Sequence, residues 1–378
     1  MSDKQTLVIG GWDYPWNSGT KKGLHFYENG ELVKDKLPTV NVGTQVYDKK
    51  NGIAYICEEV TEDPVLGAGY GGNIIAFRVT DGKLLSRVRT YGCNPTHSAY
   101  DPERKYLVVA HHNEASVDSP DVKRGCPINL YTLNDDGSIG ELKDRIVYMG
   151  PKKTQLHSIY CAPSGKFFVV NDCGGDAICT LKIVDGKLTV TNRLDVEDQY
   201  NPRYGAFHPT LPIYYGNNER VPCLSTYTYN ENGAFKKIKD LNLIVGDEKP
   251  TNNGIIPASD LIIHPNGRFL YTALRKVDRI ITIALDEAGD AKMIQSVDCG
   301  GEGTRGLSID AAGEHLYICN HASGDVAIFD ICADGTVKDS GVKLDVINAA
   351  NILVADSIST ADWPKGPMIP GAPVAKRK

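Results

Sequence analysis

The segment at residues 74–84 reads IIAFRVTDGKL, and a close copy, ICTLKIVDGKL, occupies residues 178–188. Each copy is an alternating apolar run that ends in an Asp-Gly dipeptide and continues into a second run. Asp-Gly and Asn-Gly supply the positive φ that the tightest hairpin turns need. Each segment therefore predicts two antiparallel strands joined by a short turn.

The same hairpin pattern occurs seven times along the chain. Its turn glycines lie 46 to 56 residues apart, a spacing typical of propeller blades or solenoid units. A solenoid would need polar capping units at both ends, and the sequence shows none. A single Trp-Asp dipeptide does not favour a WD40 propeller. The turn glycines are Gly30, Gly82, Gly137, Gly186, Gly233, Gly289 and Gly335.

A second hairpin precedes six of these turn hairpins, and HSIYCAPSGKFFVVND at residues 157–172 is a clear example. Each unit therefore has four strands, here called a to d, as a propeller blade does. The first unit begins at its b strand, residues 6–12, so residues 346–355 should supply the missing a strand and close the ring. We predict an all-β, seven-bladed β-propeller of four-stranded blades.

We expect one domain over residues 1–378, with a core at about 6–355 and an irregular Pro- and Gly-rich tail at 356–378. The net charge of −6 argues against a broad nucleic-acid-binding surface. The N-terminal apolar run is too short for a signal peptide or a membrane span, so we expect a cytoplasmic protein. Its ten cysteines, scattered and without a CxxC pair, are expected to be reduced.

The expected blade geometry gathers polar side chains at one end of the central channel. In each blade, the start of strand a and the end of strand b lie at the same end, and the long b–c and d–a loops open there too. Such groups either satisfy one another or await a ligand. These positions are occupied by His97, His157, Arg203, Asp260 and Arg305 on a strands and by Glu59, His111, Asp172, Glu219, Arg275 and Asn320 on b strands.

The repeats, with NPRYGAFHP at 201–209, NNE at 217–219, FLYTALR at 269–275 and TRGLSID at 304–310, resemble the lactonase family of seven-bladed propellers. The resemblance runs from about residue 6 to 355. That family includes propeller-type 6-phosphogluconolactonases and the fungal 3-carboxy-cis,cis-muconate lactonizing enzyme. The resemblance implies four catalytic residues at matching positions: His157, Arg203, Glu219 and Arg275.

The chain departs from the family pattern at two places beside these residues. Gln155 stands where a second histidine is frequent, and Ala273 and Leu274 precede Arg275 where Ser-Asn is frequent. These changes affect the expected substrate more than the expected fold. Further residues expected to contact substrate are His97, Asp172, Arg305 and Asn320.

The resemblance implies hydrolysis of a small anionic sugar lactone, with 6-phosphogluconolactone as the leading substrate. Arginines would hold the anionic group and polarise the carbonyl, while His157 or Glu219 would transfer the proton. Two alternatives remain at this point: ring closure of a carboxylated muconate and a non-catalytic propeller scaffold. The sequence has no Gly-rich phosphate loop and no convincing metal-ligand spacing, so we expect no cofactor and no metal.

Overall fold

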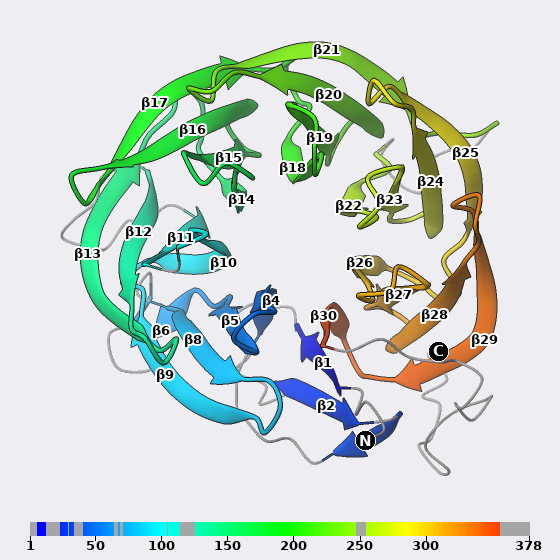
Figure 1. The fold of residues 1–378 in the computed structure, drawn as a ribbon, viewed down its shortest axis with the longest axis horizontal. Helices are drawn as coiled ribbons and strands as arrows, with labels where there is room; N and C mark the ends of the chain where they lie inside the picture. Colours follow the sequence, from blue (N-terminus) through cyan, green and yellow to red (C-terminus); the bar gives the residue numbers. More distant parts are fainter. Residues whose placement is uncertain are drawn as a thin grey trace.

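The computed structural model describes residues 6–12, 23–28, 30–33, 41–63, 67–68, 71–103, 105–113, 125–246 and 255–355. Within these ranges the chain forms thirty β-strands and no helix. Seven four-stranded antiparallel sheets surround one central channel, with the a strand of each sheet innermost (Figure 1). The predicted fold class is confirmed. The expected tail, 356–378, lies outside the described residues.

The blades follow the chain order around the ring, apart from the first, which contains both ends of the described chain. The first four blades, each from strand a to strand d, are β30 (Ala349–Val354), β1 (Thr6–Gly11), β2 (Leu24–Glu28) and β3 (Glu31–Val33); β4 (Val42–Asp48), β5 (Ile53–Glu58), β8 (Asn73–Arg78) and β9 (Lys83–Arg89); β10 (Cys93–Tyr100), β11 (Tyr106–Asn113), β12 (Cys126–Leu133) and β13 (Ile139–Tyr148); and β14 (Leu156–Cys161), β15 (Phe168–Asp172), β16 (Ala177–Val184) and β17 (Lys187–Asp195).

The remaining three blades have the same order of strands. They are β18 (Pro202–Phe207), β19 (Ile213–Asn218), β20 (Cys223–Tyr229) and β21 (Phe235–Asn242); β22 (Ala258–Ile263), β23 (Phe269–Leu274), β24 (Arg279–Leu285) and β25 (Ala291–Asp298); and β26 (Thr304–Ile309), β27 (His315–Asn320), β28 (Asp325–Ile331) and β29 (Val337–Asp345).

The C-terminal strand closes the ring as predicted. Strand β30 pairs antiparallel with β1, with Leu7 opposite Val354 and Ile9 opposite Ile352. Without β30, the inner edge of β1 would expose unpaired backbone groups. A buried apolar cluster that includes Ile9, Ile352 and Tyr317 joins this blade to the last one, so closure also completes the core.

The turns whose glycines define the sequence repeat also form hydrogen bonds with the neighbouring blade. All seven repeat glycines have positive φ, between 66° and 83°. A tyrosine on strand b of one blade donates its hydroxyl hydrogen bond to a turn carbonyl of the next: Tyr55 to Gly137, Tyr215 to Gly289 and Tyr271 to Gly335. The repeat therefore fixes both the hairpins and their mutual contacts.

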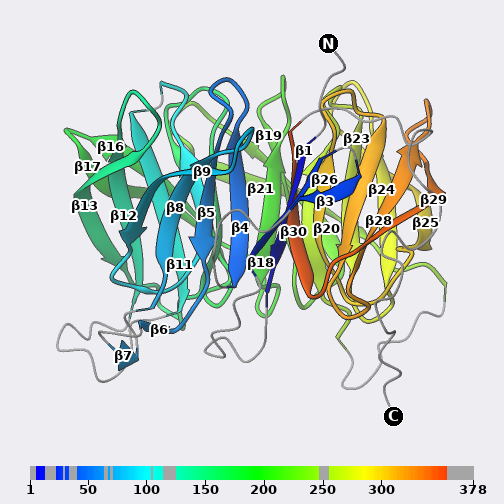
Figure 2. The same ribbon diagram turned by 90° about the horizontal axis from the view of Figure 1, so that it is seen from below.

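The two ends of the channel differ in their connections. The a–b and c–d turns lie at one end, which we call the tight-turn end. The b–c and d–a loops lie at the other, which we call the long-loop end. The short strands β6 (Glu62–Asp63) and β7 (Gly67–Ala68), in the β5–β8 connection, lie below the ring in Figure 2 and mark the long-loop end. In the described part of the chain, no helix is long and apolar enough to cross a membrane.

Candidate active site

An ion-paired cluster at the long-loop end is built on two neighbouring blades. Arg203 lies near the start of β18, Glu219 directly follows β19, and Arg275 directly follows β23. Oε1 of Glu219 accepts a hydrogen bond from Nη2 of Arg275 at 2.5 Å and lies 3.6 Å from Nε of Arg203. Burial opposes ionisation of Glu219, but the charges of Arg203 and Arg275 outweigh it and lower its pKa to about 2. Glu219 is therefore ionised at neutral pH.

Arg305, the second residue of β26, adds a third, partly buried guanidinium to the cluster. Its Cζ lies 4.1 Å from the ring centroid of Trp12, within the range of a cation–π interaction. Burial and the charge of Arg203 lower the pKa of Arg305, and the same two causes lower the pKa of Arg275 to about 10. Because these positively charged guanidinium groups repel one another, binding of an anion between them would be favourable.

His157, the second residue of β14, lies against this group of arginines and is buried. Its ring meets the ring of His112 edge-on at 5.4 Å and that of Tyr204 at 4.9 Å, measured between centroids. Burial, followed by the charge of Arg203, lowers the pKa of His157 well below its usual value. The imidazole is therefore neutral at neutral pH and has a lone pair that can accept a proton.

Several buried nitrogen atoms of the cluster have no hydrogen-bond partner within the described ranges. They are Nε and Nη1 of Arg203, Nε of Arg275 and Nδ1 of His157. Leaving a buried polar group unpaired costs about 1–3 kcal/mol, and more for a charged one, so a concentration of such groups in one place calls for an explanation. Here four of them lie in one charged cluster.

The structure brings five of the eight predicted site residues into this cluster, namely His157, Arg203, Glu219, Arg275 and Arg305. The other three have different surroundings. Oδ1 of Asp172 accepts backbone hydrogen bonds from Gln155 and Gly175, both at 2.9 Å. The Asn320 side chain accepts from Thr304 and donates to Asp325, also at 2.9 Å. Asp172 and Asn320 therefore hold the loops of their own blades, while Oδ2 of Asp172 is buried without a hydrogen-bond partner. Their role in substrate binding stays a prediction.

His97 lies further along the channel than predicted. It bonds through Nδ1 to the Ser98 carbonyl at 3.0 Å, and its ring lies 4.9 Å from that of Tyr160. Burial lowers its pKa to about 4. The physical reason for the difference is the length of β10, because His97 is the fifth residue of that strand rather than its first.

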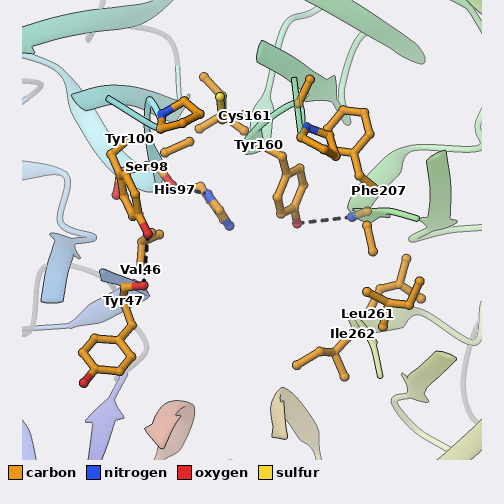
Figure 3. Close-up of a pocket in the computed structure, with 18 of the residues that line it drawn as sticks. Val46, Tyr47, His97, Ser98, Tyr100, Tyr160, Cys161, Phe207, Leu261 and Ile262 are labelled. Atoms are coloured by element: carbon orange, nitrogen blue, oxygen red, sulfur yellow. Dashed lines mark hydrogen bonds between the residues drawn. The ribbon is translucent and has the colours of Figure 1, made fainter. Parts of the chain in front are cut away.

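His97 and Tyr160 line a cavity of about 820 Å³ that opens toward the tight-turn end. Its walls come from the second halves of the inner strands, including Phe207, Leu261 and Ile262 (Figure 3). The Tyr160 hydroxyl accepts a hydrogen bond from the Gly205 amide. Arg203, Glu219, Arg275 and Arg305 do not line this cavity, so we place the site at the opposite end of the channel.

Three further residues lie at the cluster: Glu59, which the sequence placed at this end of the channel without assigning it to the site, and His112 and Trp12, which the prediction missed. The sequence does carry a signal for Glu59, because it directly follows strand b of its blade as Glu219 does. His112 follows the buried His111 in β11, and alternation along a strand points the two side chains to opposite faces. Trp12 follows β1, and nothing in its local sequence indicates the arginine that it covers.

The described residues include no group of three or more His, Cys, Asp or Glu side chains that could hold a metal ion. All ten cysteines are free, and eight of them are buried. Cys173 contacts the cluster, where its Sγ donates to Oε2 of Glu219 at 3.4 Å. Burial raises the pKa of this thiol well above its usual value, so it stays protonated.

Fold and cluster together define a closed seven-bladed propeller with one polar, arginine-rich site at the long-loop end of its channel. The chain belongs to the lactonase family: the family model described as "Lactonase, 7-bladed beta-propeller" matches residues 39–354. The resemblance noted in the sequence is therefore confirmed.

Two curated relatives are both named 6-phosphogluconolactonase. The chain is 23% identical over 334 residues to the 6-phosphogluconolactonase of Bacillus subtilis (strain 168), covering 83% of this chain and 89% of the relative. It is 24% identical over 276 residues to the 6-phosphogluconolactonase of Enterobacter sp. (strain 638), covering 71% and 77%. Among solved structures, the periplasmic gluconolactonase PpgL of Pseudomonas aeruginosa superposes with a TM-score of 0.79 at 17% identity, over 93% of this chain and 99% of that one.

Proposed function

We propose that this protein hydrolyses a small anionic sugar lactone and that 6-phosphogluconolactone is its first candidate substrate. The observation that carries the proposal is the cluster of three arginines, Arg203, Arg275 and Arg305, in which the guanidinium groups of Arg203 and Arg275 have buried nitrogens without a hydrogen-bond partner in the described structure. Family membership and the names of the curated relatives support the same chemistry.

The arginines are suited to bind the anionic group of the substrate. A guanidinium presents its donors as a planar fork that matches a carboxylate or a phosphate, and these charge-assisted bonds are among the strongest in proteins. Glu219 offsets part of the charge of Arg203 and Arg275 and fixes their positions. The remaining donors would bind the anion and polarise the lactone carbonyl, where negative charge develops during attack.

His157 is suited to accept the proton of the attacking water. Its imidazole is neutral, and its Nδ1 has no partner among the described residues. An anion bound by the arginines would offset the positive charges that depress the pKa of His157. Substrate binding would thus make His157 a stronger base when the reaction needs one.

A panel of lactones tests the proposal directly. Purified protein is assayed by proton release with 6-phosphogluconolactone, gluconolactone and muconolactones, and we expect the anionic sugar lactone to be hydrolysed fastest. The muconolactones test the cyclising chemistry named above as an alternative. Hydrolysis of none of these lactones would contradict the proposal.

Substituting one arginine tests anion recognition. Arg275→Ala should lower kcat/KM for the anionic lactone by roughly tenfold to a hundredfold, because a hydrogen bond to a charged group contributes about 1.5–3 kcal/mol. The loss on uncharged gluconolactone should be much smaller. Arg268→Ala is the matched control, because Arg268 is an exposed arginine in a turn at the opposite end. Equal losses on charged and uncharged lactones would rule out a specific role in binding the anion.

A further inference from the structure

The two glutamates of the site have different environments. Both carboxylate oxygens of Glu219 are engaged, Oε1 by Arg275 and Arg203 and Oε2 by the thiol of Cys173. Its low pKa means that it has no proton to give at neutral pH. Glu219 is therefore suited to hold the arginines in place rather than to transfer a proton.

Glu59 faces the same cluster from another blade and is 8% exposed. Its backbone amide donates to the carbonyl of Asn41 at 2.7 Å, which fixes the residue at the end of β5. Its side chain lies against Gly43, where an added Cβ would come within 2.9 Å of Oε2. In the described structure, no Lys, Arg or His nitrogen forms an ion pair with this carboxylate.

The titratable and charged groups that face Glu59 come from several elements packed around it. His112, Arg305 and Arg203 act on it from β11, β26 and β18, and Tyr204 and Cys57 also interact with it. Burial raises the pKa of Glu59, and its electrostatic interactions with His112, Arg305 and Arg203 only partly oppose this rise. The shift is opposite in direction to that of Glu219.

We propose that Glu59 is the catalytic acid of this site, which donates a proton to the ring oxygen of the lactone as the ester bond breaks. The assignment rests on the function proposed above. Water adds its oxygen to the carbonyl carbon and gives a proton to Nδ1 of His157. The bond between that carbon and the ring oxygen then breaks, and the ring oxygen takes the proton of Glu59 to become a hydroxyl. His157 returns its proton to Glu59 through solvent, and the new carboxylic acid releases one proton to water.

The other groups of the cluster are less suited to this role. Arginine stays protonated in proteins, so it does not transfer a proton to the leaving ring oxygen. Burial raises the pKa values of Tyr204 and Cys173, which makes them weak acids. Asp260 has a pKa raised to about 6, but its two oxygens accept the backbone amides of Leu261 and Leu307.

The test compares Glu59→Gln with the wild-type protein on the lactone that the panel shows to be hydrolysed fastest. A positioned acid contributes about 10²–10⁴ in rate, so kcat should fall by that factor while KM stays within about threefold. The wild-type kcat should decline on the alkaline side as Glu59 loses its proton, and this decline should be absent from the variant. Glu302→Gln, an exposed glutamate in a d–a loop at the same end, is the matched control and should behave as wild type.

Each outcome decides a separate question. A wild-type protein inactive on every lactone refutes the proposed function. An active wild type with a Glu59→Gln variant of unchanged kcat, or of lower kcat with the alkaline decline retained, refutes the assignment of Glu59 alone. If Glu59→Gln fails to fold, Glu59→Asp replaces it, because the shorter carboxyl should lower kcat tenfold or more and keep an alkaline decline. An unchanged kcat in Glu59→Asp would equally refute the assignment.

Discussion

Deleting residues 346–378 should unfold the whole ring, because the deletion removes β30 from the first blade. The deleted segment buries four aliphatic side chains, Val346, Ile352, Leu353 and Val354, each no more than 7% exposed. Full burial of such a side chain contributes about 1.5–3 kcal/mol, so the loss amounts to roughly 6–12 kcal/mol. This is comparable with the total stability of about 5–15 kcal/mol that is usual for a folded protein.

The loss should extend beyond one blade for a topological reason. Asn351 donates hydrogen bonds from Nδ2 to the carbonyls of Val42 and Gly43 in the second blade, and it accepts one from Gln45. The cluster of Ile352 and Tyr317 joins the first blade to the last. Removing β30 thus weakens both interfaces of its blade and exposes an edge of β1.

Thermal unfolding followed by circular dichroism measures the effect, with a deletion of residues 356–378 as the control that keeps every described strand. We expect the control to melt as the full chain does and the longer deletion to be unfolded or to melt far lower. A cooperative transition at the wild-type temperature after deletion of 346–378 would show that β30 does not hold the ring closed.

Three further predictions concern His157, Glu219 and Asp172. The neutral form of His157 is the proposed base, and its pKa is lowered from 6.5. The value of kcat/KM for a carboxylated lactone should therefore be maintained as the pH falls past 6.5 and be lost only well below that pH. A loss of kcat/KM that begins at or above pH 6.5 would contradict this. Glu219→Gln should lower the free energy of unfolding, measured with urea, by about 3 kcal/mol, because Arg203 and Arg275 lose their shared carboxylate. Inorganic phosphate should stabilise this variant more than it stabilises the wild type. Equal stabilisation of the two proteins would argue against anion binding by these arginines. Asp172→Ala should lower the free energy of unfolding by about 1–3 kcal/mol and leave KM unchanged, whereas a raised KM with wild-type stability would support its role in binding.

Much of the site followed from strand order alone. Arg203, Arg305 and His157 begin a strands, while Glu219 and Arg275 follow b strands, and antiparallel pairing places these positions at one end of the channel. Strand order did not indicate that Asp172 and Asn320 bond to their own loops, although they occupy the same kind of position. Position along a strand specifies the end of the channel at which a side chain lies, but not its hydrogen-bond partners.

The sequence by itself determined the architecture, because each hairpin is a local pattern of alternating residues and turn glycines that repeats seven times. The sequence also indicated that the ring closes, because the first blade lacks its a strand and the C-terminal segment contains one additional strand. Only the tertiary structure decided how Glu59 and Glu219 differ. They share the same position relative to their b strands, but one carboxylate lies between two arginines and a thiol while the other lies buried without an ion pair among the described residues. Burial and charge at a site depend on residues contributed by several blades, which no local segment of sequence contains.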